Sequence, residues 1–446
     1  MVRISGSVYK PKEQKHIILD ICKLDDNLRG VAYVGAKRYA VSGALPREKV
    51  LAVVKKTENN VSYADVKSVL EAAPERAEPF CRYYGKCGYC RLMHADYAAG
   101  LKQKTDLVRK KLWSLGVRSV EECVSMGKTA CKNRAVIAFK RKDGAVEAGV
   151  FDPETQKVTN IKGCHLFGGW YAGFIKILNE WANEYGPGDA KSLKGVLSFA
   201  EARYIDGALL LTLVSPSPSV KNLEELYNSL AGRFRAVSLW LCVKSDSGGD
   251  TSLIHIAGQK RLQISMLGVR CEIGPFYLFA ENEKTAEAMY KKLADIIKET
   301  GAEYVVEAYP DIGLAAALFA KAGAKVVSVK PTPDSERRAK KLCNKNEITG
   351  VEYLCGSVGE ILPALTPRGK TALLISSSKQ EGNFGQAVLK FSPDIILYLS
   401  SDISRLTDDL LPLCDNGYSV VSATPYDSIP YSCNVETLVC LAKTIK

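Results

Sequence analysis

The chain has 446 residues, more than one hydrophobic core usually supports, so we expect two or three domains. Hydrophobic residues make up 46% and charged residues 25%, the composition of a globular protein. No stretch is long and uncharged enough to span a bilayer, and the N-terminus has no apolar signal core. We therefore expect a cytoplasmic monomer without a membrane partner. Its 14 cysteines favour reduced thiols and one metal site over a disulfide framework.

Positive charge is concentrated in one part of the chain. The formal net charge is +12, and residues 81–142 alone contain 15 Lys and Arg against 4 Asp and Glu. Such a concentration predicts a surface that binds a polyanion, most plainly a nucleic acid. A solvated basic surface without a partner is the alternative.

The first 72 residues contain short apolar segments separated by turn residues. The expected strands cover residues 17–22, 31–34, 39–41, 50–54 and 62–66, and glycines lie between several of them. This spacing predicts a small β-barrel, and barrels of this size commonly bind oligonucleotides. Residues 72–79 then form a linker.

The middle of the chain mixes helices and strands. A helix is expected over residues 101–115, where apolar residues share one face and Gly116 can end the helix. Further strands are expected over 135–139, 208–214 and 238–243, with helices over 170–185 and 223–234.

The last third of the chain alternates between helices and apolar strands. Strands are expected over 304–308, 325–329, 371–375 and 395–399, with helices over 285–300, 313–322 and 336–344. This alternation predicts a doubly wound α/β domain whose ligand lies outside the carboxyl ends of its strands.

Three closely spaced cysteines form the candidate metal site. Cys81, Cys87 and Cys90 have C-x5-C-x2-C spacing in a loop that contains glycine. Thiolates spaced in this way can face one centre, and Cys164 is the best candidate for a fourth ligand. An iron–sulfur cluster is expected, with zinc as the second choice. Three ordinary core cysteines are the alternative.

These features together resemble the RNA 5-methyluridine (uracil-C5) methyltransferases that carry a TRAM domain and a [4Fe–4S] cluster. The resemblance covers nearly the whole chain. It rests on residues 30–32 and 41–46, on the cysteine loop, on residues 132–134, and on residues 417–418, 425–427 and 434–436 near the end. It implies an OB-like TRAM β-barrel over 1–72, a central α+β iron–sulfur domain over 73–270, and a Rossmann-like class I methyltransferase domain over 271–446. In this arrangement helix 101–115 packs on the last domain.

The resemblance also implies a chemistry. Such an enzyme binds S-adenosylmethionine in its α/β domain and flips a uridine out of folded rRNA or tRNA. A cysteine adds to C6 of the base, C5 then takes the methyl group, and a glutamate removes the proton from C5.

The residues at the expected S-adenosylmethionine positions differ from the pattern of that family. The glycine-rich loop is replaced by a segment containing Tyr309, Asp311 and Gly313. Lys330 stands where a glutamate should bind the ribose hydroxyls, and a lysine can donate hydrogen bonds but not accept them. The remaining changes at S-adenosylmethionine or substrate positions are Ser357, in place of an acidic residue near the adenine, and Ser376, in place of the first residue of Asp-Pro-Pro-Arg.

The catalytic positions are altered as well. Ser401 stands at the position of the nucleophilic cysteine, and a serine hydroxyl needs a dedicated base. Glu436 matches the general base, but its usual histidine neighbour is Asn434. The Phe-x-Gln-x-Asn motif becomes residues 278–282 and loses the amide that reads the uracil edge.

The sequence therefore predicts an RNA-binding homologue of these enzymes in which methyl transfer is lost or strongly impaired. S-adenosylmethionine binding is not expected. An active rRNA or tRNA uracil-C5 methyltransferase with another nucleophile, such as Cys433, is one alternative. An iron–sulfur sensor whose cluster controls RNA binding is the other.

Overall fold

The computed structural model describes residues 15–142, 145–152, 155, 157–184, 197–244, 251–308, 312–376 and 384–444. Tyr309 and Asp311, both expected near a cofactor, lie outside these residues. The chain divides into two compact units, one formed by Met1–Phe80 with Arg91–Gly100 and the other by Cys81–Cys90 with Leu101–Lys446. The expected domain boundaries near residues 72 and 270 stay predictions.

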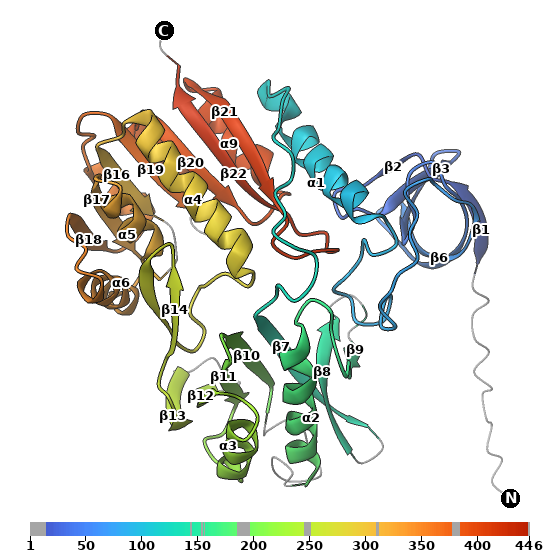
Figure 1. Ribbon diagram of the computed structural model, residues 1–446. Coiled ribbons are helices and arrows are strands. Elements are labelled where there is room, and N and C mark those ends of the chain that lie inside the picture. Colours follow the sequence, from blue (N-terminus) through green and yellow to red (C-terminus); the bar gives the residue numbers. More distant parts are fainter. Residues whose placement is uncertain are drawn as a thin grey trace, which may run out of the picture. The chain divides into compact units, whose positions relative to one another are not determined.

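The first unit contains a six-stranded sheet in the order β1-β5-β6-β4-β3-β2. Its strands curl around a small apolar core (Figure 1). All neighbouring strands are antiparallel except β4 and β6. The five strands expected in this region are confirmed. The strands are β1 (His16–Asp20), β2 (Lys23–Leu24), β3 (Gly30–Val34), β4 (Lys37–Ser42), β5 (Lys49–Glu58) and β6 (Val61–Glu71).

Within the second unit, a seven-stranded sheet has the order β13-β12-β11-β10-β7-β8-β9. Strand β11 is buried at every position, and α2 and α3 contribute to the same hydrophobic core. The strands are β7 (Arg134–Lys142), β8 (Ala145–Asp152), β9 (Lys157–Thr159), β10 (Phe199–Ile205), β11 (Ala208–Ser215), β12 (Ala236–Lys244) and β13 (Thr251–Gly258), and the helices are α2 (Gly169–Glu184) and α3 (Leu223–Ala231).

The second large sheet of this unit has the order β18-β17-β16-β19-β20-β22-β21. The first five strands are parallel, and β22 runs antiparallel to both of its neighbours. The strand order reverses between β16 and β19, so the expected doubly wound arrangement is confirmed. The strands are β16 (Tyr304–Ala308), β17 (Lys325–Lys330), β18 (Val351–Cys355), β19 (Thr371–Ser376), β20 (Ile395–Ser400), β21 (Tyr418–Tyr426) and β22 (Glu436–Lys443).

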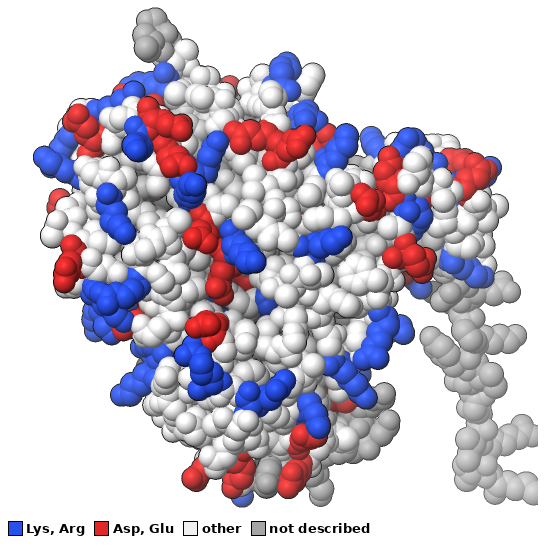
Figure 2. Space-filling model, in the orientation of Figure 1, with Lys and Arg blue, Asp and Glu red and all other residues white. Residues whose placement is uncertain are grey.

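Helices accompany this sheet along its length. They are α4 (Glu283–Thr300), α5 (Leu314–Lys321), α6 (Pro333–Lys345), α7 (Val358–Ile361), α8 (Phe384–Phe391) and α9 (Leu406–Cys414), with a short 3-10 helix at Leu362–Ala364. Figure 2 shows acidic and basic side chains mixed over much of one face, with Lys and Arg gathered near the place that α6 occupies in Figure 1.

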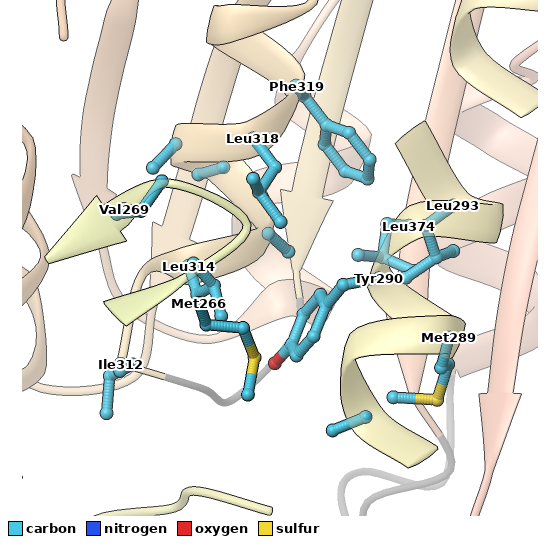
Figure 3. Packing of buried hydrophobic residues seen from close by; sticks show 14 of the residues in the cluster. Met266, Val269, Met289, Tyr290, Leu293, Ile312, Leu314, Leu318, Phe319 and Leu374 are labelled. Carbon is cyan, nitrogen blue, oxygen red and sulfur yellow. The ribbon is translucent and has the colours of Figure 1, made fainter. Parts of the chain in front are cut away.

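A hairpin covers part of the α/β core. Its strands are β14 (Leu262–Met266) and β15 (Val269–Ile273), which pair antiparallel. Figure 3 shows Met266 and Val269 of the hairpin beside Leu314 and Leu318 of α5, with Tyr290 of α4 nearby. Apolar side chains from three elements therefore fix the hairpin against the sheet's helices.

Helix α1 (Tyr97–Leu112) continues into a 3-10 turn, Trp113–Leu115. Gly116 ends it with a positive φ of 81°, which glycine adopts without strain. On the same helix Lys104 is 2% exposed and forms an ion pair with the buried Asp427. Its ammonium also donates to the carbonyl oxygens of Ile429 (3.3 Å) and Asn434 (2.7 Å). One lysine thus fixes the segment 427–434. Within the described residues, no helix is long and apolar enough to cross a bilayer.

We expect Lys104→Met to lower the free energy of unfolding by about 3–5 kcal/mol, because it leaves the Asp427 carboxylate buried without a cation. Thermal unfolding of the full chain measures the effect. Lys102→Met is the matched control, since Lys102 is 75% exposed on the same helix and also pairs with an aspartate. That exposed pair contributes at most about 1 kcal/mol. Equal losses in the two variants would contradict the role of Lys104.

Candidate functional site

A cleft of about 520 Å³ lies at the carboxyl ends of β19 and β20. Ser376 ends β19, Ser400 and Ser401 come at the end of β20, and Glu436 begins β22. The structure thus brings together three of the residues singled out in the sequence, namely Ser376, Ser401 and Glu436. We call this cleft the base pocket. Three groups of residues form its other walls. They are the loop Phe276–Asn282; the side chains Ala286, Met289 and Tyr290 of α4 with Ser428, Ile429 and Asn434 of the segment before β22; and the charged residues Arg134, Glu201 and Arg203 of the sheet that contains β7 and β10.

Glu281 links two parts of the pocket wall. Its carboxylate pairs with Lys132 through one oxygen and accepts from Arg134 through the other, at 2.7 Å. Arg134 also donates twice to Glu201, at 2.6 and 2.9 Å. Lys132 and Glu201 are buried, whereas Arg134 is 33% and Glu281 is 25% exposed, so these ion pairs are partly shielded from water. The loop carrying Glu281 is therefore held against the strands β7 and β10.

The backbone of the same loop is held by Arg203, which is 2% exposed. Its guanidinium donates to the carbonyl oxygens of Phe279 (3.2 Å) and Ala280 (3.1 Å) and to the side chain of Asn133 (3.0 Å). Asn282 then caps α4 by accepting from the backbone N–H of Thr285 (3.3 Å). A rigid loop and a capped helix therefore form one side of the pocket.

Glu436 has a perturbed acidity. Burial raises the pKa of Glu436 above the ordinary glutamate value, and a hydrogen bond from the Ser428 side chain partly opposes that rise. A carboxyl group with a raised pKa in a cleft is suited to exchange protons with a bound molecule. The sequence assigned this position to a general base, and its environment is compatible with that chemistry.

A buried ion pair occupies the ends of β16 and β17. Lys330 and Glu307 are both 0% exposed, and their charged atoms lie 3.0 Å apart. Ser328, on the same strand as Lys330, donates to Oε2 of Glu307 at 2.6 Å, and Lys330 also donates to Oε1 at 3.2 Å. The lysine predicted to replace a ribose-binding glutamate therefore bonds to the protein itself.

Gly313 and Ser357 are two further positions at which the sequence predicted cofactor binding. Gly313 has a φ of +92°, and a Cβ there would lie 2.7 Å from the Cβ of Ala339 in α6. Close packing of α5 and α6 is sufficient to require glycine at this position. Ser357 precedes α7, and the neighbouring Gly356 donates to the carbonyl oxygen of Lys330 at 3.0 Å. Of the positions predicted for cofactor binding that lie within the described residues, only Ser376 lines the base pocket.

The cysteine loop is anchored beside β9. Thr159 donates to the carbonyl oxygen of Lys86 (3.0 Å), the hydroxyl of Tyr83 accepts from the backbone of Lys162 (3.1 Å), and Tyr89 meets Phe167 edge-on with ring centroids 6.2 Å apart. These contacts bring the loop to the segment that carries Cys164.

The four predicted ligand thiols act on one another electrostatically. Burial raises the pKa of Cys90, and the charges of Cys164, Cys87 and Cys81 raise it further. Four thiols are a suitable donor set for an iron–sulfur cluster or zinc. However, among the described residues no group of three or more His, Cys, Asp or Glu side chains is arranged to hold a metal ion. The predicted [4Fe–4S] or zinc site is therefore not confirmed.

The basic stretch 81–142 does not place all of its charge on the surface. Lys104 and Lys132 are buried, where they pair with Asp427 and Glu281. Arg134 is one-third exposed and is shared by two glutamates. Part of the positive charge that suggested a polyanion surface therefore has a structural role.

Several pairings in the site were not predicted from the sequence. Glu307 matches the acidic residue that opens the expected glycine-rich loop, but its pairing with Lys330 depends on β16 and β17 being neighbours. Glu201, Arg203 and Glu281 carried no signal in the sequence, because their pairing depends on how a sheet and a distant loop meet.

Comparison with known proteins adds to this geometry. A solved structure of the tRNA (uracil-54, C5)-methyltransferase of Pyrococcus abyssi, in complex with S-adenosyl-L-homocysteine, matches with a TM-score of 0.75 and 19% identity. The match covers 95% of this chain and 99% of that one. The chain has a methyltransferase fold. Its sequence is also similar to proteins named uncharacterized RNA methyltransferases, over nearly their full length.

Two of these relatives illustrate the similarity. One from Clostridium tetani is 25% identical over 426 residues, which is 92% of each chain. One from Listeria monocytogenes is 24% identical over 447 residues, covering 96% of this chain and 98% of the relative. No family model matches the chain.

The raised pKa of Glu436 predicts a pH-dependent stability. The folded chain holds this proton to a higher pH than the unfolded chain, so folding loses free energy as the pH rises above the ordinary range of glutamate. Glu436→Gln removes that loss. We expect the free energy of unfolding to increase by on the order of 1 kcal/mol at pH 7.5 and not to change at pH 4. At the higher pH this corresponds to a rise of about 2 °C in melting temperature.

Melting curves of wild type and variant across this pH range test the prediction. Glu184→Gln is the control, because it removes the same charge from an exposed position at the end of α2. A gain from Glu436→Gln that is equal at both pH values would show that removal of a buried charge is not its cause.

Proposed function

We propose that this chain binds folded RNA, receives a uridine in the base pocket, and has lost methyl transfer or retains it only weakly. The proposed loss of methyl transfer rests on the buried ion pair between Lys330 and Glu307, whose side chains are both 0% exposed. In the methyltransferases that the sequence resembles, an acidic side chain at the position of Lys330 accepts hydrogen bonds from the ribose of the methyl donor.

A simple comparison of free energies supports this proposal. A ligand that needs this space must separate Lys330 from Glu307, and breaking a buried ion pair costs about 3–5 kcal/mol. A micromolar dissociation constant corresponds to about 8 kcal/mol of binding free energy. Displacement of the ion pair would consume about half of that amount. We therefore propose that S-adenosylmethionine binds at best very weakly.

The base pocket supports the RNA-binding part of the proposal. Its volume of about 520 Å³ lies in the range of sites for small molecules, which is about 300–1,000 Å³. Phe279 and Tyr290 supply aromatic surface, while Glu436 and Ser401 supply polar groups. A base can enter such a pocket only after it leaves its stack. The names of the relatives point to RNA, and that of the Pyrococcus abyssi protein points to a uridine in tRNA.

The finer domain assignment belongs to the same proposal. We take the strand unit as a TRAM-like barrel over 1–72, followed by an iron–sulfur domain over 73–270 and a Rossmann-like domain over 271–446. In this arrangement the barrel contributes a second contact to the RNA.

An active uracil-C5 methyltransferase is the second candidate, and one observation favours it. Glu436 keeps the position of the general base, and burial raises its pKa toward the range in which proton transfer is efficient. Such an enzyme still requires a nucleophile. Ser401 lines the base pocket, whereas Cys433 is not among the residues that line it.

Isothermal titration with S-adenosylmethionine and a methyl-transfer assay distinguish the two candidates. We expect wild type to bind an unmodified tRNA transcript and to transfer no label to it. Titration with about 100 μM methyl donor, a concentration that would saturate a site of micromolar affinity, should give no heat. Ser401→Cys restores the thiol and is also expected to stay inactive, because donor binding is the missing step. Micromolar donor binding, or 5-methyluridine formed by wild type, would overturn the loss of function.

We further propose that Cys81, Cys87, Cys90 and Cys164 hold a [4Fe–4S] cluster, with zinc as the alternative. The support is the spacing of the first three cysteines and the contacts that bring their loop to the segment carrying Cys164. Protein purified without oxygen should be brown and contain iron by metal analysis. Cys164→Ser should lower the metal content, whereas Cys433→Ser, the control, should leave it unchanged. Protein that contains neither iron nor zinc would overturn the proposal.

A further inference from the structure

A second, smaller cleft lies between α6, the hairpin β14–β15 and the segment that follows the hairpin. Its volume is about 180 Å³. Six cationic side chains line it, against two carboxylates. We call it the arginine cleft. The cations are Arg261, Arg270, Arg337, Arg338, Lys341 and Lys345, and the carboxylates are Glu272 and Asp334.

The carboxylates do not balance the cations. Glu272 is shared by Lys341 (2.6 Å) and Lys345 (3.1 Å). Asp334 is likewise shared by two arginines of the next helical turn, one of them Arg337 at 3.0 Å. Across the described parts of the chain, no carboxylate pairs with Arg261 or Arg270. A formal excess of four positive charges therefore converges on one small volume, which an anion would relieve.

An aromatic ring orients two of the cations. The guanidinium of Arg261 lies 5.4 Å from the ring centroid of Tyr277, and that of Arg338 lies 4.5 Å from it. Gly274 permits this approach, because a Cβ there would lie 3.0 Å from both Arg261 and Tyr277. Arg261 donates from Nη1 to the carbonyl oxygen of Lys260 at 2.8 Å, and Arg338 donates from Nη1 to Asp334, so each guanidinium keeps further N–H groups for a ligand. The planar array of N–H groups on a guanidinium matches the oxygens of a phosphate group.

The size of the cleft limits its ligand. Sites for whole small molecules occupy about 300–1,000 Å³, and this cleft is below that range. A single phosphate group with part of its sugar suits a space of about 180 Å³ better than a free cofactor does.

The arginine cleft and the base pocket share a wall. Tyr277 lines both of them. Phe276 and Leu278, the neighbours of Tyr277 in sequence, line the base pocket and are 37% and 63% exposed, so apolar surface faces solvent beside the shared wall. Exposed side chains of this kind can contact unstacked bases or sugars along a strand.

We propose that the arginine cleft binds a backbone phosphate of the same RNA strand whose base enters the base pocket. The inference rests on the proposed binding of RNA and adds to it the residues that fix the position of the strand. The Lys and Arg side chains that gather near α6 in Figure 2 are consistent with this contact. A solvated basic helix would explain the charge alone. It would not explain why Arg338 of α6 and Arg261, which precedes β14, both stack on one tyrosine that also lines the base pocket.

The salt dependence of RNA binding tests the proposal. Fluorescence anisotropy with an unmodified tRNA transcript gives the dissociation constant of the full chain at several KCl concentrations. Loss of one phosphate contact lowers the slope of log K against log salt by about 0.7–0.9. We expect this change for Arg261→Gln, with about tenfold weaker binding. Arg270→Gln on the same cleft should act in the same way, and it keeps the test valid if Arg261→Gln impairs folding.

Lys325→Gln is the matched control. Lys325 is exposed at the start of β17, away from the cleft, and the substitution removes the same single charge. If wild type binds RNA and all three variants bind it equally, the arginine cleft is not a phosphate site, although the proposed function stands. If wild type does not bind RNA, the proposed function itself fails. Uridine 5′-monophosphate is the second probe. If it binds tightly to wild type but not to Arg261→Gln, the cleft is a site for a free nucleotide and the proposed contact with an RNA backbone phosphate is wrong.

Discussion

Glu281 is the residue on which the geometry of the base pocket depends. Its two carboxylate oxygens bind Lys132 and Arg134, which lie at the start of β7. Its own loop leads directly into α4, which packs in the α/β part of the chain. An ion pair at an interface of this kind is worth little when water can reach it. Here Lys132 is buried and Arg134 also binds the buried Glu201, so the pairs are partly shielded and link the loop of Glu281 to β7 and β10.

The pocket that results combines contributions from distant parts of the chain. Serines at the ends of two parallel strands face a glutamate that begins an antiparallel strand, and an arginine-supported loop closes the side. This is the location at which doubly wound sheets bind ligands. The fold therefore has an open cleft at the carboxyl ends of β19 and β20, while a buried ion pair fills the ends of β16 and β17.

Much of the fold could be predicted from the sequence because its elements carry strong local patterns. The strands 304–308 and 325–329 are apolar runs bounded by turn residues, and helix α1 ends at a glycine as expected. Ser376, Ser401 and Glu436 could be placed in one site because family resemblance ordered them along the strands. The pairing of Lys330 with Glu307 could not be predicted, since it depends on which strands are neighbours and on complete burial of both side chains. Local periodicity also cannot distinguish the buried Lys104 from the exposed Lys102 with its own aspartate partner.

The ion pair at the ends of β16 and β17 also limits which single substitutions this part of the fold tolerates. An acidic residue at position 330 would place two buried carboxylates side by side, and a neutral residue at position 307 would leave the buried ammonium without its carboxylate. Each single change costs several kcal/mol, a large share of the roughly 5–15 kcal/mol that stabilises a domain. Residues 307 and 330 are therefore coupled, so that a stable exchange at one position requires a compensating exchange at the other.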